Sequence, residues 1–515
     1  MISKATFKTI QNWTTECNDH HACVKPNTEK NSYAGPSRLV FLAADNPECV
    51  KIVDVKTKMD YIALSYCWGR DGTMKLTRSN LGMWKELLPV QELPKTLRDS
   101  MAFARLLGME YIWIDRLCII QDDLESMARE IAAMPQVYSE AWLTLSVSSA
   151  KDCRDGFLFS AKECHEALPK SLIAVRLRCP DGALGFVTLT EKSDWEKPSK
   201  ESIDYRAWTM QESMLSPRLL RFSSRYIEWN CKSGEETHYH DGTESIGGVN
   251  SKVLKDGMNR PAGDLRWSTI VANYSERQLN FPGDKLPAIS ALAQFFYQHN
   301  INDGSGESEY LAGIWKKALP KALMWRTRSS DRNTRPAVYR APSWSWASVD
   351  GPVDISGKNL DIVFVTRIRH IQLIRCGVTP VSPLAPYGAV SSGYIKLIGR
   401  MIQAYWDLGA KKVSHVDFDD VHGWPDVSND DLPKDPDQNV EKVPVSCLEL
   451  GKTGRGHTQT IGLILVPATG QYLSADSGIK TQQFRRVGIF GYPTKVNLVR
   501  VMPFNQCPHT IITIV

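Results

Sequence analysis

The run of aromatic and β-branched residues at 111–114, YIWI, constrains the fold more than any other feature of the sequence. Such residues favour a β-strand. Because apolar side chains fill successive positions, both faces of this strand should be covered, as in the centre of a parallel sheet. The run ends at Asp115, where the crevice of an open α/β sheet holds its ligand. Asp115 is therefore a candidate site residue; the alternatives are a loop cap or an ion pair with Arg116.

Other apolar segments predict strands and helices that alternate around this run. Residues 61–66, YIALSY, predict an earlier strand, and residues 97–107 repeat apolar side chains at helical spacing before Gly108. A second helix should begin near Asp123, and residues 142–147, WLTLSV, predict a third strand. The apolar face of the second helix is expected to consist of Leu124, Met127, Ile131 and Met134. This order predicts an α/β fold with a doubly wound, mostly parallel sheet.

The length of 515 residues exceeds a single core, so two or three domains are expected. Downstream, GYIKLIGRM, IGLILVPA and FRRVGIFGY predict strands, so the C-terminal half should be mixed and β-rich. We divide the chain into an N-terminal extension packed on the core (1–57), the α/β domain (58–215), a mixed α/β region (216–410), an acidic flexible loop (411–445) and a β-rich segment (446–515).

Composition describes an ordinary globular protein. The net charge of +5 is small beside 62 basic and 57 acidic residues, and no dense basic run is present, which argues against nucleic-acid binding. The sequence has no apolar window long enough for a membrane span, and its N-terminus lacks a signal-peptide core. We therefore expect a cytoplasmic protein whose 12 cysteines are mostly reduced.

Two cysteines and two histidines crowd together near the N-terminus, at Cys17, His20, His21 and Cys23. Thiol and imidazole side chains are the usual ligands of zinc. However, the spacing fits no standard zinc finger, and no CxxC pair follows. The sequence therefore favours buried structural thiols, and we predict no metal site.

Four blocks resemble the fungal heterokaryon-incompatibility (HET) domain family. They are YIALSYCWG at 61–69, LPKTLRDSMAFARLLGMEYIWIDRLCIIQDD at 93–123, VYSEAWLTLSVSSA at 137–150 and RAWTMQE at 206–212. Farther on, YSERQL, DKLPAISALA, YLAGIW and APSWSWASVDG resemble the C-terminal region common in such proteins. The sequence departs from the family at Arg116, where a small residue is usual, and at Met127, where a Trp is usual. An Arg at this place can pair with Asp115 or bind an anion.

The resemblance implies a role in self/non-self recognition between fusing fungal cells, ending in cell death. It also implies a TIR-like fold, and some TIR domains cleave NAD. Glycosidic cleavage of NAD needs a carboxylate near the ribose, because its transition state resembles an oxocarbenium ion. We predict Glu130 for this role, since it lies one to two turns into the helix after the central strand; a charge at the rim of the helix is the alternative.

Residues at the end of the first strand are expected to line the same crevice. Ser65, Trp68 and Gly69 lie there, and Trp68 can either stack on a base or anchor a loop. Cys118 follows the strand-end Asp by three residues, which suggests a nucleophile, but its apolar neighbours favour a buried thiol. Glu212 belongs to a block with an arginine, so an internal ion pair is expected, with catalysis as the alternative.

The sequence leaves three functions open. It does not decide whether the protein is an enzyme. It lacks the P-loop, GxGxxG, HExxH and GxSxG strings of common nucleotide-binding and hydrolytic sites. The leading hypothesis is an incompatibility factor that triggers cell death, with NAD as a candidate substrate and no bound cofactor. The second is a non-catalytic module that binds a protein partner or itself through the β-rich region. The third is a HET-domain protein repurposed to act on a small molecule in a fungal secondary-metabolite pathway.

Overall fold

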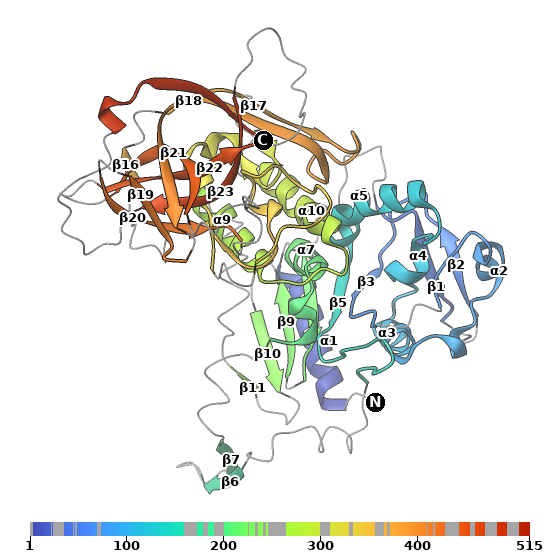
Figure 1. Cartoon of the computed structure of the whole chain (residues 1–515). Helices are drawn as coiled ribbons and strands as arrows, with labels where there is room; N and C mark the ends of the chain where they lie inside the picture. Colours follow the sequence, from blue (N-terminus) through green and yellow to red (C-terminus); the bar gives the residue numbers. More distant parts are fainter. Residues whose placement is uncertain are drawn as a thin grey trace. The chain divides into compact units, whose positions relative to one another are not determined.

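The computed structural model covers the chain as two compact units, Met1–Lys255 and Asp256–Val515 (Figure 1). It describes residues 4–21, 23, 35–44, 46, 49–69, 74–158, 173–178, 184–189, 200–224, 226–231, 235–239, 244–245, 264–298, 309–328, 333–355, 365–367, 371–407, 409–415, 418–427, 442–453, 459–468, 482–491 and 504–515. Within this described part, every helix is too short or too polar to cross a membrane.

The first unit is built on a nine-stranded sheet with the order β11-β10-β9-β8-β5-β3-β4-β1-β2. Its strands are β1 (Arg38–Leu42), β2 (Val50–Asp54), β3 (Ile62–Ser65), β4 (Tyr111–Trp113), β5 (Leu143–Val147), β8 (Arg218–Phe222), β9 (Tyr226–Cys231), β10 (Glu235–Tyr239) and β11 (Glu244–Ser245). A separate hairpin pairs β6 (Ile173–Arg178) with β7 (Leu184–Leu189).

The predicted parallel core is present, but the sheet as a whole is mixed. Parallel pairing joins β4 to β3, β3 to β5 and β5 to β8. Every residue of β3 and β5 is buried, as expected for strands covered on both faces. The five outer pairings of this described sheet are antiparallel, so the prediction of a mostly parallel sheet was wrong. The predicted N-terminal extension contributes β1 and β2 to the sheet.

The helices of the first unit are α1 (Lys4–His20), α2 (Leu81–Glu86), α3 (Lys95–Leu106), α4 (Asp115–Cys118), α5 (Leu124–Glu140) and α7 (Trp208–Leu215). Gly108 follows α3 with a φ of +75°, which L side chains rarely adopt, so the predicted stop after residue 107 is confirmed. The Asp123 side chain caps α5 by accepting a hydrogen bond from the Ser126 amide. Pro135 lies inside α5 and does not end it.

The buried face of α5 differs from the predicted one. Leu124 is 79% exposed, whereas the polar side chains of Ser126 and Glu130 are buried. Of the four apolar residues predicted for this face, Met134 is the one that is buried. The face is rotated because polar partners, described below, hold Glu130 against the sheet.

The second unit contains a nine-stranded sheet that closes on itself, because β18 pairs with both β19 and β21. Its strands are β16 (Val365–Arg367), β17 (Gln372–Pro380), β18 (Val390–Asp407), β19 (Lys412–His415), β20 (Phe418–Pro425), β21 (Lys442–Thr453), β22 (Gln459–Pro467), β23 (Gln483–Gly491) and β24 (His509–Ile514). Short pairs join β12 (Tyr310–Leu311) to β13 (Ile314–Trp315) and β14 (Arg326–Thr327) to β15 (Val353–Asp354), and the helices are α9 (Asp264–Ser275) and α10 (Pro287–Phe296). The predicted acidic loop contains strands: residues 412–415 form β19, and residues 418–425 form β20. Residues 416–417 and 428–441 of that loop lie outside the described residues.

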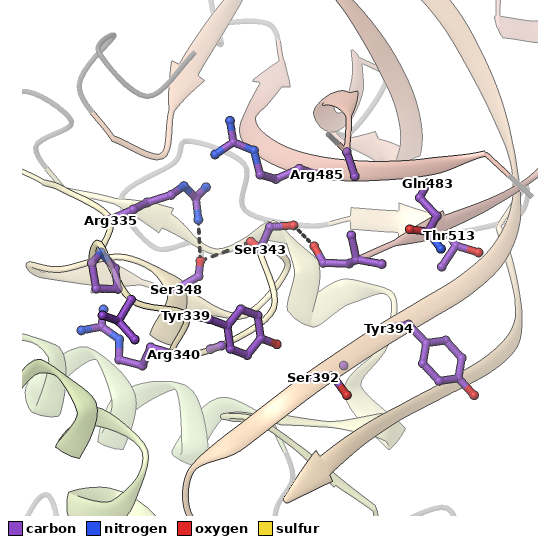
Figure 2. A pocket seen from close by; sticks show the side chains of 16 residues that line it. Arg335, Tyr339, Arg340, Ser343, Ser348, Ser392, Tyr394, Gln483, Arg485 and Thr513 are labelled. Carbon is purple, nitrogen blue, oxygen red and sulfur yellow. Dashed lines mark hydrogen bonds between the residues drawn. The ribbon is translucent and has the colours of Figure 1, made fainter. Parts of the chain in front are cut away.

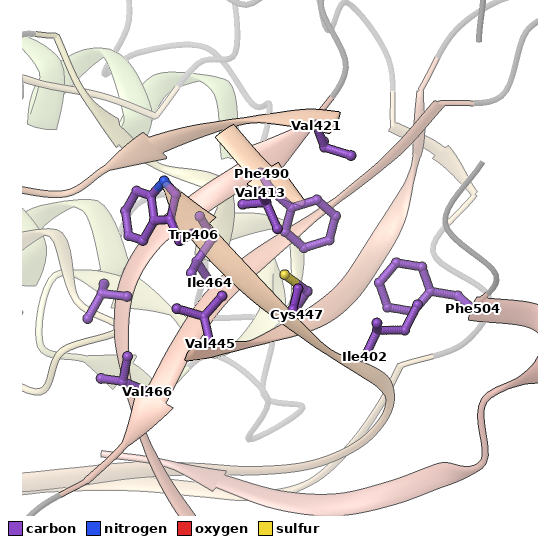
Figure 3. Close-up of a cluster of buried hydrophobic side chains, with 12 residues drawn as sticks. Ile402, Trp406, Val413, Val421, Val445, Cys447, Ile464, Val466, Phe490 and Phe504 are labelled. Atoms are coloured by element: carbon purple, nitrogen blue, oxygen red, sulfur yellow. The ribbon is translucent and has the colours of Figure 1, made fainter. Parts of the chain in front are cut away.

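Apolar side chains fill the interior of this closed sheet (Figure 3). Trp406 from β18 packs there with Val445, Ile464 and Phe490 from three other strands. Gly423 lies so close to the indole that an added Cβ would be 2.8 Å from Trp406 Nε1. This close approach explains why a glycine occupies the middle of β20.

Candidate functional site

The carboxyl ends of β3 and β4 meet at one edge of the parallel core, where the sequence places Asp115 and Trp68. Asp115 is the first residue of α4 and follows β4 directly. Its Oδ2 accepts a hydrogen bond from Trp68 Nε1 at 2.6 Å, and its Oδ1 accepts one from the Arg116 amide at 2.7 Å. Burial nevertheless raises the pKa of Asp115, although these hydrogen bonds and the charge of Arg206 oppose the shift.

A second carboxyl group, that of Glu212, reaches the same place from α7. It is 7% exposed, and its Oε2 accepts a hydrogen bond from the Ser65 hydroxyl at the end of β3. Burial raises the pKa of Glu212 to about 7, against the hydrogen bond from Ser65 and the charge of Arg206, while the charge of Asp115 adds to the increase. Glu212 can therefore gain or lose a proton near neutral pH.

Arg206 and two tyrosines complete this group, which we call the Asp115–Glu212 cluster (Ser65, Tyr66, Trp68, Asp115, Tyr138, Arg206 and Glu212). Arg206 Nη1 donates a hydrogen bond to the Tyr66 carbonyl, and its charge favours the ionised form of both carboxyl groups. Both tyrosines are buried, and Tyr138 donates a hydrogen bond to the Leu64 carbonyl at 3.3 Å. Burial and the nearby carboxylates hold the pKa of each hydroxyl well above its ordinary value, so both stay protonated as potential donors.

Comparison with protein families identifies the segment that holds this cluster. Residues 61–212 match the family model described as "Heterokaryon incompatibility protein (HET)". This segment is a HET domain. It begins at the residue before β3 and ends at Glu212, so it contains every member of the Asp115–Glu212 cluster. No curated protein and no solved structure matches the chain.

Arg116, one of the two departures from the family pattern, packs beneath Trp68 of the Asp115–Glu212 cluster. Its side chain is fully buried, and its guanidinium lies over the Trp68 ring at 4.7 Å from the centroid. It also donates hydrogen bonds to the Trp68 carbonyl at 3.2 Å and to Cys153 Sγ at 3.5 Å. Arg116 thus fixes the indole that holds Asp115, a packing task that a small residue cannot perform.

Gly69 is required by the turn that follows Trp68. It has a φ of +73°, and an added Cβ would lie 1.9 Å from Asp152 Oδ2. Asp152 is itself held by hydrogen bonds from the Arg154 amide and guanidinium. Only glycine fits this approach, so Gly69 shapes the end of β3 through its backbone.

Glu130, the predicted catalytic residue, has different partners. It accepts hydrogen bonds from the Ser37 hydroxyl and from Arg38 Nη1, the latter at 3.4 Å. Arg38 Nη1 also donates to the Cys118 carbonyl at 3.2 Å. The carboxylate therefore links α5 to the start of β1, and it is buried, not a charge at the rim. Its catalytic role stays a prediction, while the described contacts favour Glu212 for that role.

Cys118 has the surroundings of a buried structural thiol. Its Sγ accepts a hydrogen bond from the Ile114 amide at 3.5 Å, and the side chain is fully buried. Burial raises the pKa of Cys118 to about 12, so the thiolate is scarce at neutral pH. These features favour the structural interpretation over the nucleophilic one.

The second unit holds a pocket that the sequence did not indicate. Its volume is about 600 Å³, and its wall combines apolar side chains with polar and basic ones (Figure 2). The labelled lining residues are Arg335, Tyr339, Arg340, Ser343, Ser348, Ser392, Tyr394, Gln483, Arg485 and Thr513. Arg335 donates to Ser348 at 2.8 Å and lies 3.4 Å from the Asp426 carboxylate. The segment 335–348 and the strands β18, β23 and β24 supply these residues, and because these segments are far apart in the sequence, no local motif predicts the pocket.

Proposed function

We propose that this protein acts in heterokaryon incompatibility, as a factor that triggers death of fused fungal cells, and that its HET domain cleaves the glycosidic bond of NAD. The match of residues 61–212 to the HET family supports the first part. The observation that carries the second part is Glu212, a buried carboxyl group with a pKa of about 7 beside a second carboxyl group, Asp115.

The chemistry requires one bond to break and one to form. The bond between ribose and nicotinamide breaks, and its electron pair leaves with the nicotinamide nitrogen, so positive charge develops on the ribose. Water then adds to the ribose carbon and gives up a proton, which yields ADP-ribose. A base with a pKa near the working pH is well suited to accept that proton. Glu212 meets this requirement, and the charge of Asp115 favours a cationic ribose nearby.

The test is NAD consumption by the purified full chain, with nicotinamide and ADP-ribose measured by chromatography. We expect the wild-type protein to release both, and Glu212→Gln to lose about 100-fold or more in turnover, as is usual for a general base. Glu130→Gln is the matched control, because it removes a buried carboxylate of the same domain. Loss of turnover in Glu130→Gln alone would move the catalytic role to Glu130, and absence of turnover in the wild type would contradict the catalytic part of the proposal.

A second candidate function is a binding module without catalysis, and the pocket of the second unit favours it. Three arginines and two tyrosines line that pocket, and both residue types are enriched where proteins bind one another. The two functions differ in a cell-death assay in a fungal host. The enzyme predicts that Glu212→Gln abolishes death, whereas the module predicts that Glu212→Gln retains it and that Tyr394→Ala, in the pocket, abolishes it.

A further inference from the structure

Four metal-binding side chains meet in the first unit, outside the Asp115–Glu212 cluster. The Sγ atoms of Cys17, Cys23 and Cys231 and a ring nitrogen of His21 all lie within 4.8 Å of one another. Cys17 is in the last turn of α1, and His21 comes four residues later, so both side chains lie on one side of the helix end. Cys231 is the last residue of β9, and α1 lies beside β9 (Figure 1).

The donor set and its spacing suit zinc. Three thiolates and one imidazole form a tetrahedral structural zinc site, with bonds of about 2.3 Å to sulfur and about 2.0 Å to nitrogen. Such bonds place neighbouring ligand atoms roughly 3.4–3.8 Å apart. The distance from Cys231 Sγ to His21 Nδ1 is 3.4 Å. We propose that Cys17, His21, Cys23 and Cys231 together bind one zinc ion.

The surroundings supply the charge that such a site needs. Zinc with three thiolates carries a net charge of −1, which is costly to bury without a partner. Arg218 pairs in register with Cys231, is buried, and interacts electrostatically with Cys17. Among the described residues, the Nε and Nη1 atoms of Arg218 have no hydrogen-bond acceptor. Its buried positive charge can therefore offset a nearby negative one. A bound zinc–thiolate group would provide the matching anion.

The site is structural in kind. The three thiols are 0–5% exposed, and four protein ligands fill the tetrahedron, which leaves no position for a substrate. The ion would fasten the end of α1 to the end of β9, two segments that are far apart in the sequence. Zinc binding would thus contribute directly to the stability of the first unit.

The neighbouring histidine provides a matched control. His20 is adjacent to His21, but its side chain is 64% exposed and its Nδ1 lies 3.4 Å from the Glu16 carboxylate in the preceding turn of the helix. Replacing His20 removes an exposed side chain, whereas replacing His21 removes a proposed ligand of the ion. A His20→Ala variant should therefore keep the metal, whereas His21→Ala should lose it.

The experiment measures zinc by mass spectrometry in the untagged full chain after loading with zinc and dialysis. We expect about one zinc per chain in the wild type and in His20→Ala, and a loss of at least several-fold in His21→Ala and Cys231→Ser. Cobalt bound to the wild-type chain in place of zinc should give the intense thiolate-to-metal absorption of a Cys₃His site. This measurement needs no variant, so it holds even if a variant fails to fold. A wild type without zinc, equal zinc in the two histidine variants, or a disulfide between two of the three cysteines would overturn the proposal.

Discussion

Each unit of the molecule buries a carboxylate beside an arginine, and the two arrangements differ in how completely the charges are matched. In the second unit, Asp426 accepts two hydrogen bonds from Arg486, at 3.0 and 2.9 Å. Arg486 also donates hydrogen bonds to the carbonyls of Leu323 and Trp325, and its guanidinium lies over the Trp325 ring at 3.6 Å from the centroid. In the HET domain, the hydrogen bonds to the Glu212 carboxyl group come from neutral hydroxyls, those of Ser65 and Tyr138, while Arg206 acts through its charge.

This difference separates a structural ion pair from a site prepared for chemistry. A bidentate, fully buried pair whose arginine also donates to two backbone carbonyls keeps both groups charged and holds the chain in place. A buried carboxyl group with a weaker partner takes up a proton more readily, so its pKa moves toward neutrality. The burial of the two carboxylates is similar, and their partners decide what each can do.

The largest expected effect comes from breaking the matched pair. Asp426→Asn should lower the free energy of unfolding of the second unit by about 3–5 kcal/mol, because Arg486 would remain buried without a counter-charge. Hydrogen exchange of β23 in increasing urea would measure this loss for that unit alone. Asp420→Asn is the control, since its pair with Lys412 is half-exposed, and it should change stability by less than about 0.5 kcal/mol. Equal effects of the two variants would show that the Asp426–Arg486 pair has no special structural role.

The next effect is a pH dependence that belongs to Glu212. Its pKa in the folded protein, about 7, lies above the ordinary value of 4.5, so the native state binds more protons than the unfolded state between these values. The free energy of unfolding of the first unit should therefore fall as pH rises through this window, by about 3 kcal/mol at most. Glu212→Gln cannot ionise and should lack this contribution.

The measurement is hydrogen exchange of β3 and β5 at about pH 5 and about pH 8, corrected for intrinsic exchange rates. The stability of Glu212→Gln relative to the wild type should increase between the two conditions. Ser65→Ala removes the hydrogen bond that favours the ionised carboxylate, so it should deepen the fall seen in the wild type. Parallel pH profiles for the wild type and Glu212→Gln would show that Glu212 titrates at its ordinary pKa.

A smaller effect distinguishes Glu130 from Glu212. Glu130→Gln keeps the shape of the side chain but loses the charge that pairs with Arg38, so we expect a cost of about 1–2 kcal/mol in the free energy of unfolding. Turnover of NAD should be unchanged. Glu125→Gln, on the same helix with a side chain 83% exposed, is the control and should be close to neutral. A Glu130→Gln variant that folds stably but loses turnover would reverse the two assignments.

The sequence predicts what depends on local pattern and misses what depends on distant partners. The apolar runs at 61–66, 111–114 and 142–147 identify the parallel core, because a strand buried on both faces has its own signature. Strand pattern does not specify neighbours, so the antiparallel flanks and the closed sheet of the second unit were not predicted. The same limit applies to Cys231, which joins Cys17 and Cys23 only through the fold.

The choice between the two glutamates shows this limit at the candidate site. Helical spacing places Glu130 beside an apolar stripe, but the side chains that α5 buries are decided by Ser37 and Arg38, which come from another segment. Glu212 sits in a short helix whose sequence favours an ion pair, and only the meeting of α7 with β3 brings its carboxyl group to Ser65. Asp115, Trp68 and Ser65 were predicted at this edge of the sheet because strand ends fix their place.

The most direct test of this account is the protonation state of Glu212, observed by infrared difference spectroscopy between about pH 5 and about pH 8. We predict a protonated carboxyl band that disappears with an apparent pKa of about 7 in the wild type and is missing from Glu212→Gln. A Glu212 carboxylate that is already ionised at about pH 5 would contradict the claim that the HET domain holds a carboxyl group prepared for acid–base chemistry.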